Sequence, residues 1–182
     1  MENELHLFKI KLQALGALRP EAWGAILALK QELALAPNES FVRREGSLAL
    51  VALGVLKEYD IQCRSKPAIV NFIGENQCFI TSVHQQNHYL EACTPCQLYY
   101  WNEQALQQLY QEFAELKLIY NQLCAQYDAQ LWHRMRLLEM PVQERLDTFR
   151  ATFTNVLPYL KKKDIANYLH LNYTHLVKSW NG

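Results

Sequence analysis

The stretch between residues 164 and 180 places the tightest constraint on how this chain can fold. It reads DIANYLHLNYTHLVKSW, in which apolar residues recur at helical spacing on both sides of a short polar turn. Asn172 stands just before the second helical run, where a side-chain oxygen can cap free backbone N–H groups. His170 takes the turn position, and histidine tolerates a left-handed backbone better than most non-glycine residues. The pattern predicts a helix-turn-helix, a unit that lays its second helix in the major groove of DNA.

Charge is distributed unevenly along the chain, although the formal net charge is zero. Residues 134–182 hold eight Lys and Arg against four Asp and Glu, a balance of +4, and residues 1–133 hold ten against fourteen, a balance of −4. A basic end on an acidic body fits a DNA-binding segment. The longest apolar run has nine residues, fewer than the roughly 20 that span a membrane, and no secretion signal opens the chain. We therefore expect a cytoplasmic protein with no membrane partner.

Helical and β-type segments alternate along the chain. Residues 2–35 show helical periodicity with a break at Pro20. From residue 40 to about residue 100, short β-type runs are separated by glycines and by a Thr-Pro pair. Short strands at this spacing favour a small antiparallel barrel or jelly roll. The expected strands cover residues 48–52, 55–59, 68–72, 89–92 and 97–101.

A long helix is predicted next, from a cap at Asn102 to about residue 138. Its apolar residues repeat at alternating steps of three and four, the spacing of a coiled-coil seam. Such a seam favours a homodimer, although the same face could instead cover its own domain. The seam residues expected at the dimer interface are Leu109, Phe113, Leu116, Tyr120, Leu123 and Tyr127.

The order of these segments resembles the Crp/Fnr family of bacterial transcription regulators. The similarity is carried by FVRREGSLALVALGVLKEY and HYLEACTPCQLYYW in the strand region, by FIGE at residues 72–75, and by ERLDTFRATF and KKKDIANYLHLNYTHLVKSW near the end. FIGE resembles the start of the cassette that holds a cyclic nucleotide in that family. The resemblance implies an α+β fold with a double-stranded β-helix (jelly-roll) domain and long dimerisation helix over residues 1–138. A helix-turn-helix domain would follow over residues 139–182.

The resemblance also implies a ligand site formed by Gly74, Glu75, Gln86 and Asn87. Glu75 matches the family glutamate that bonds a ribose hydroxyl, or serves simply as a turn carboxylate. The family's phosphate-binding Arg-Ser pair falls on Gln86 and Asn87, and no Lys or Arg lies between Glu75 and Trp101. Each lost charge-assisted bond is worth about 1.5–3 kcal/mol. We therefore do not expect cyclic AMP: the barrel would either sense an unidentified small-molecule effector or serve as a scaffold.

On the DNA side, the resemblance implies that Tyr173, Thr174, His175 and Lys178 face the duplex. Tyr173 and Thr174 replace the family's Arg and Glu, so a bidentate contact with guanine is missing. Lys178 matches a basic position that contacts guanine or phosphate. The chain stops at Gly182, so we expect no β-hairpin wing. The expected partner of the homodimer is double-stranded DNA with a pseudo-palindromic site.

Immediately before the helix-turn-helix, Lys161 and Lys162 begin a run of three lysines. They are candidates for salt-sensitive phosphate contacts, and equally for a solvated charge run without function.

Other chemistries fit the sequence less well. Cys93 and Cys96 form a CxxC pair in a strand-to-strand turn rather than at a helix start, so we expect buried thiols rather than a redox pair. No second ligand pair completes a zinc site. No motif of a nucleotide-binding, hydrolase or metalloprotease site is present, so we expect neither an enzyme nor a cofactor. The alternative is a ligand-binding or scaffold dimer module with a degenerate DNA-binding end.

Overall fold

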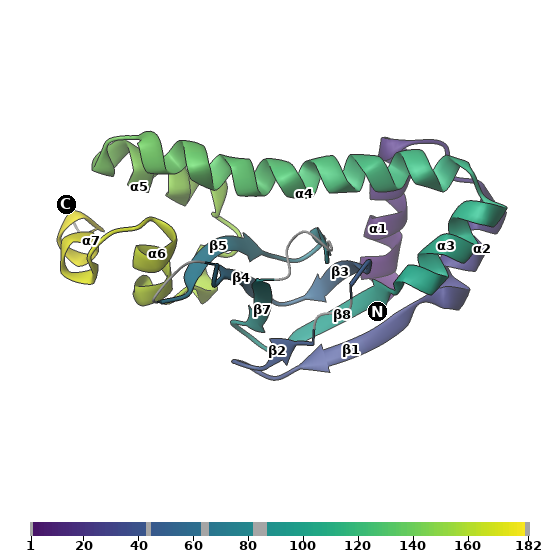
Figure 1. The fold of residues 1–182 in the computed structure, drawn as a ribbon, viewed down its shortest axis with the longest axis horizontal. Coiled ribbons are helices and arrows are strands. Elements are labelled where there is room, and N and C mark those ends of the chain that lie inside the picture. The colour runs from purple at the N-terminus through teal and green to yellow at the C-terminus, as the bar shows by residue number, and fades with distance from the viewer. Residues whose placement is uncertain (1, 43–44, 63–65, 82–86, 181–182) are drawn as a thin grey trace.

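The computed structural model of the chain describes residues 2–42, 45–62, 66–81 and 87–180, and Figure 1 shows its fold. A β-barrel lies beneath one long helix, and two short helices follow at the far end (Figure 1). The strands are β1 (Gln31–Leu35), β2 (Ser40–Phe41), β3 (Leu48–Leu53), β4 (Leu56–Asp60), β5 (Ala68–Ile73), β6 (Cys78–Ile80), β7 (His88–Ala92) and β8 (Cys96–Trp101). The helices are α1 (Glu2–Leu15), α2 (Pro20–Leu29), α3 (Glu103–Glu112), α4 (Glu115–Glu139), α5 (Val142–Thr152), the single 3-10 turn η2 (Leu157–Tyr159), α6 (Lys162–Tyr168) and α7 (Tyr173–Trp180).

Two antiparallel sheets form the barrel, with strand orders β1-β8-β3-β6 and β2-β7-β4-β5. Residues from both sheets share one apolar core. β3 buries all of its residues except the last, because the sheet is covered on both faces. Trp101, at the end of β8, is almost fully buried, and its indole Nε1 donates to the Ile26 carbonyl of α2 at 2.8 Å. The N-terminal helices thus close one end of the barrel.

The five strands expected from the sequence correspond to β3, β4, β5, β7 and β8, and are confirmed. The helical expectation through residue 35 is wrong, because Gln31–Leu35 forms β1. Its Gln, Glu, Leu and Ala residues favour helix locally, but pairing with β8 sets Leu33 opposite Leu98 and buries Leu35. Tertiary pairing therefore overrides local propensity here. β2 and β6, which contain two and three residues, were too short to predict.

Two helices form where the sequence predicts one from Asn102 to about residue 138. Asn102 is the expected cap, since its side chain accepts from the Ala105 N–H at 2.9 Å. The helix ends at Phe113, whose backbone leaves the helical region at φ −132° and ψ 89°. The Phe113 ring is buried in the barrel core, and α4 restarts at Glu115. Leu109, Phe113 and Leu116 are buried in the same core, so the extended backbone at Phe113 separates the two helices without changing the face that they bury.

The C-terminal helices share a second apolar core with the outer face of the β4–β5 sheet. Phe72 of β5 lies with its ring centroid 6.2 Å from that of Phe149 and 5.1 Å from that of Tyr168. The predicted domain boundary at residues 138 and 139 falls in the last turn of α4. The two predicted domains are therefore packed against each other. None of the helices formed by the described residues combines enough length with enough apolar character to cross a membrane.

Candidate DNA-binding helix and effector cavity

The turn between α6 and α7 has the geometry of a helix-turn-helix. His170 is left-handed at φ 53°, and the Leu171 N–H donates to the Ala166 carbonyl at 2.9 Å, the closing bond of a Schellman-type helix end. Asn172 Oδ1 then accepts from the Thr174 N–H at 2.9 Å and caps α7. The predicted left-handed turn and the predicted cap are both confirmed.

One face of α7 is open to solvent. Leu176 is fully buried and anchors the helix, whereas the four residues expected to face DNA are all exposed: Tyr173, Thr174, His175 and Lys178. α7 lies at one end of the molecule, beyond α6 (Figure 1). Hydroxyl, imidazole and ammonium groups on such a face can donate to phosphate oxygens and touch base edges.

Part of the basic excess at this end of the chain is structural, which the sequence did not reveal. Arg134 is buried, and its Nε donates to the Tyr168 carbonyl at 2.9 Å. Arg145 donates to the Leu169 carbonyl at 2.8 Å. These guanidinium groups hold the carbonyl end of α6, where cations are favourable. The two arginines are therefore committed to the fold.

The three lysines at the start of α6 differ from these arginines, because their side chains do not bond to the rest of the described chain. Lys161 and Lys163 are exposed and Lys162 is half-buried. Among the hydrogen bonds and ion pairs of the described residues, none involves these three side chains. They can therefore contact phosphate without breaking a bond within the chain.

Asn167 joins α6 to the barrel. Its Oδ1 accepts from the Ile69 N–H at 2.7 Å, and its Nδ2 donates to the Pro67 carbonyl at 3.0 Å. β5 is one of the two edge strands of its sheet in the described part of the chain, so the Asn167 carboxamide takes the place of a neighbouring strand. The helix-turn-helix is thus held on the sheet edge by a pair of directional bonds.

Lys57 makes a second link between α6 and the barrel. Its Nζ lies 2.9 Å from Glu91 on β7 and 3.3 Å from Asp164 on α6. Burial by itself would lower the pKa of Lys57, but the hydrogen bond to Glu91 and the other partners outweigh it and raise the pKa. Lys57 therefore remains charged and bridges α6 to the barrel.

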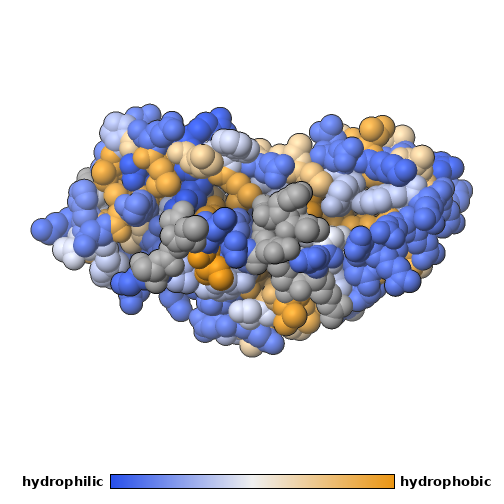
Figure 2. All heavy atoms as spheres, viewed as in Figure 1, coloured by the Kyte–Doolittle hydropathy of each residue, from blue (hydrophilic) through white to orange (hydrophobic). Residues whose placement is uncertain are grey.

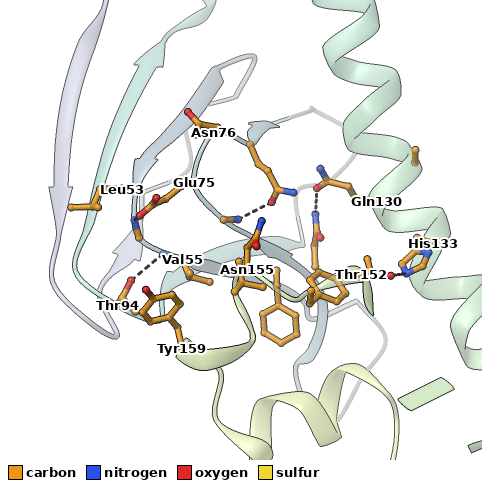
Figure 3. A pocket seen from close by; sticks show the side chains of 18 of the residues that line it. Leu53, Val55, Glu75, Asn76, Thr94, Gln130, His133, Thr152, Asn155 and Tyr159 are labelled. Atoms are coloured by element: carbon orange, nitrogen blue, oxygen red, sulfur yellow. Dashed lines mark hydrogen bonds between the residues drawn. The ribbon is translucent and has the colours of Figure 1, made fainter. Parts of the chain in front are cut away.

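A cavity of about 790 Å³ opens where the barrel, α4 and the segment after α5 meet. We call residues 153–161, between α5 and α6, the connector. One wall is formed by the β3–β4, β5–β6 and β7–β8 turns, a second by α4 and a third by the connector (Figure 3). The polar side chains around it are those of Asn71, Glu75, Asn76, Gln77, Thr94, Gln130, His133, Arg136, Thr152, Asn155 and Tyr159.

Among the residues that the structure describes, the side chains of Glu75 and Arg136 are the charged groups that line this cavity. Glu75 Oε1 accepts from the Gly54 N–H at 3.2 Å, which links the β5–β6 turn to the β3–β4 turn. His133 Nε2 lies 3.2 Å from Thr152 Oγ1 on α5. Partial burial, and then repulsion by Arg136, lowers the pKa of His133 below its usual value of 6.5. The imidazole is therefore neutral at pH 7.

The predicted ligand residues are only partly brought together. Gly74 and Glu75 lie in the β5–β6 turn and line the cavity. Asn87 is exposed, does not line the cavity, and accepts from the Ile61 N–H through its carbonyl at 3.0 Å. Gln86 lies outside the described residues. The sequence could not find the α4 and connector walls, because their residues are distant along the chain.

The predicted dimer seam faces the molecule's own barrel. Five of its six residues are buried in the barrel core, Leu109, Phe113, Leu116, Leu123 and Tyr127, and Tyr120 packs against that core. The assignment of these residues to a partner helix is therefore corrected, because they already cover the open side of the barrel. The sequence had allowed for this possibility.

The CxxC pair consists of two free thiols, Cys93 in the β7–β8 turn and Cys96 at the start of β8. Burial raises the pKa of Cys93 to about 12 and also raises the pKa of Cys96. Cys96 Sγ lies 3.4 Å from the Val55 carbonyl, as a weak donor. The pair has no helix start to stabilise a thiolate.

Comparisons with known proteins identify the fold. No protein-family model matches the sequence, and no curated protein matches it. A protein of Eubacterium rectale assigned to the Crp/Fnr family of transcriptional regulators matches with a TM-score of 0.70 at 13% identity, over 90% of this chain and 82% of that chain.

Two further solved structures have the same arrangement. FixK2 from Bradyrhizobium japonicum has a TM-score of 0.68 at 14% identity, over 84% of this chain and 83% of its own. The c-di-GMP responsive global regulator CLP of Xanthomonas campestris has a TM-score of 0.65 at 15% identity, over 90% of both chains. These similarities confirm the α+β architecture expected from the sequence.

Proposed function

We propose, from the Crp/Fnr fold of this chain, that the protein is a transcription regulator that binds double-stranded DNA as a homodimer in the cytoplasm. The observation that carries the proposal is the exposed polar face of α7 on a correctly turned helix-turn-helix. Leu176 anchors the inner face of α7 in the core, and nothing in the described chain covers Tyr173, Thr174, His175 or Lys178. A helix presented in this way can enter a major groove.

The proposed contacts divide between base edges and phosphates. Thr174 can touch a thymine methyl group, and Lys178 can reach guanine or a phosphate. Tyr173, His175, Lys161 and Lys162 can hydrogen-bond or pair with phosphate oxygens. Because α7 carries no arginine, base discrimination rests on single rather than bidentate bonds.

The homodimer is proposed to form through the solvent side of α4. Leu118, Ala125 and Trp132 recur every seven residues on the helix face opposite the buried seam, and Met135 lies beside them. Leu118, Trp132 and Met135 expose 68%, 61% and 54% of their surface. Figure 2 shows apolar side chains interrupting the hydrophilic surface along the edge where α4 runs. We call these four residues the outer stripe; a second copy of α4 would bury it.

The first test is selection of bound duplexes from a random DNA library, with affinity followed against salt. The expected result is a pair of half-sites about 34 Å apart in pseudo-palindromic order. Lys178→Ala should weaken binding by roughly 1–3 kcal/mol, whereas Lys117→Ala, an exposed lysine on α4, should not. A steep salt dependence without an enriched sequence would limit the protein to phosphate binding.

Absence of DNA binding at low salt would refute the regulator and favour the alternative, a ligand-binding or scaffold dimer. The bonds of Asn167 and Lys57, which fix the helix-turn-helix to the barrel, are the observation that supports this second function. A unit held in this way could serve as structure alone.

A further inference from the structure

We propose that Arg150 of α5 is the positioning residue for α7, and that its contacts with Trp180 fix the angle at which α7 meets the DNA bases. The inference rests on the function proposed above, because it concerns how the same helix discriminates between sequences. Arg150 acts through the end of α7 and need not touch a base. α5 and α7 lie at the same end of the molecule (Figure 1).

Packing by itself holds α7 mainly at one side chain. The helix has eight residues, and Leu176 is its one fully buried side chain, whereas Val177, Ser179 and Trp180 are half-buried. The cap at Asn172 holds the first turn. A helix held at its start and at one side chain can still tilt, so a further contact is needed at its last turn.

Arg150 supplies that contact through two parts of Trp180. Its Nη2 donates to the Trp180 carbonyl at 2.8 Å, and its guanidinium carbon lies 4.4 Å from the centroid of the Trp180 ring. A cation is favourable at the carbonyl end of a helix, and a guanidinium group over an indole ring adds a cation–π attraction. Arg150 Nη1 also lies 3.2 Å from Asp147 on its own helix, which orients the guanidinium group.

α5 is a fixed base for this contact. Leu146 and Phe149 are fully buried in the C-terminal core. Arg145 bonds two carbonyl groups at the end of α4 at 2.8 and 2.9 Å, and also the Leu169 carbonyl at the end of α6. α5 therefore holds the ends of both helices of the helix-turn-helix, α6 through Arg145 and α7 through Arg150.

The geometry of α7 shows why its angle matters for base contacts. Lys178 lies six residues beyond Asn172, about 9 Å along the helix axis. A tilt of about 10° about the first turn would move the Lys178 backbone by about 1.5 Å. Hydrogen-bond distances from N–H to oxygen span only about 0.5 Å, so a shift of this size would break a contact. Arg150 holds the end of the helix next to Lys178.

The test compares the affinity for the duplex selected in the experiment above with that for a scrambled duplex of the same composition, at a temperature at which every variant is folded. The ratio of the two affinities measures discrimination. Arg150→Gln should lower this ratio at least about tenfold, the equivalent of one lost base contact. Arg150→Lys keeps the charge, so its affinity for the scrambled duplex should stay within about twofold. Its ratio should still fall, because an ammonium group does not reproduce the planar guanidinium contact.

Two further comparisons separate positioning from stability. Leu33→Ala removes packing from the barrel core and should lower the free energy of unfolding in urea without changing the ratio. Trp180→Ala removes the ring and should lower the ratio, and Trp180→Phe, which returns an aromatic ring to the guanidinium group, should restore most of it. If the ratio falls in Leu33→Ala as much as in Arg150→Gln, Arg150 acts through stability alone and the proposal is wrong.

A measurement without DNA separates failure of this proposal from failure of the regulator. Amide hydrogen exchange in the last turn of α7 should be at least about tenfold faster in Arg150→Gln. Arg136→Gln, which removes an exposed arginine of α4, should leave it within about twofold. Unchanged exchange in Arg150→Gln would overturn the proposal. If the unaltered protein enriches no sequence, the regulator is refuted, and hydrogen exchange still decides whether Arg150 fixes the end of α7.

Discussion

His133 is a side chain whose protonation the fold opposes. It lies at the cavity wall between Thr152, with which it shares a hydrogen bond, and Arg136, which repels its charged form. In the unfolded chain His133 is not buried, and Arg136 is not held next to it. The difference links the protonation of this one residue to the stability of the whole protein.

We expect stability to fall as the pH drops below 6.5. In the unfolded chain His133 takes up a proton near its usual pKa of 6.5, whereas in the folded chain its pKa is lower. The unfolded state therefore binds more protons below pH 6.5, so this contribution to the stability is complete above pH 6.5 and is lost on acidification. Urea unfolding between about pH 8 and about pH 5.5 measures this contribution. His133→Gln should remove it and Arg136→Gln should reduce it; an unchanged pH slope in both variants would contradict the assignment.

The thiols of Cys93 and Cys96 should react slowly in the folded protein. Burial raises the pKa of both, so little of the nucleophilic thiolate exists at pH 7. Alkylation with iodoacetamide followed by peptide mass mapping should show fast labelling of these two residues only after unfolding. Rapid formation of a Cys93–Cys96 disulfide in dilute peroxide would instead support a redox role.

Among the secondary-structure elements, the contact between α6 and the edge of β5 holds the helix-turn-helix in place. The bonds of Asn167 to Ile69 and Pro67 come from one side chain, and no strand of the described residues pairs with β5 on that side. Lys57 adds a charged link through Asp164. α6 therefore completes the sheet and carries α7 at the same time.

Asn167→Ala should destabilise the protein by about 1–2 kcal/mol, because the Ile69 N–H loses its acceptor. Asn167→Asp keeps the acceptor and loses only the bond to Pro67, so it should cost less. Urea unfolding measures both, and amide hydrogen exchange at Ile69 should speed up in the alanine variant alone. Equal stability of all three proteins would show that the edge contact is not stabilising.

These elements also show which features the sequence could reveal. Asn172 and His170 were predictable because a cap and a left-handed turn depend on adjacent residues. β1 was not, because its helix-forming residues are held extended by β8, which lies far along the chain. The roles of Arg134 and Arg145 as bonds to the end of α6 were equally invisible, since charge alone does not say which carbonyl a guanidinium will meet. The cavity required three distant segments to be placed together.

Taken as a whole, the molecule has a long helix with two different faces. The inner face of α4 is consumed by the barrel, and the outer stripe is left exposed. The regular apolar seam in the sequence therefore did not show whether this face of the helix packs against a partner subunit or against the chain's own core. The proposed dimer depends on the weaker, outer pattern.

Trp132→Glu should raise the dissociation constant of the homodimer at least about tenfold, because it places a charge at the centre of the outer stripe. Gln126→Glu adds the same charge at an exposed position of α4 outside that stripe and should leave the dimer intact. Analytical ultracentrifugation over a range of concentrations measures both. If Trp132→Glu sediments like the unaltered protein, the outer stripe is not the interface.

The contact between Gly74 and Val156 limits how far the two halves of this protein could be exchanged with those of other proteins. A barrel that carries any side chain at position 74 would collide with Val156, since even a methyl group has no space there. A hybrid that grafts foreign C-terminal helices onto this barrel would need a residue shaped like Val156 at that point. Exchange of C-terminal helices between barrels of this fold would thus depend on the fit of this one pair of residues.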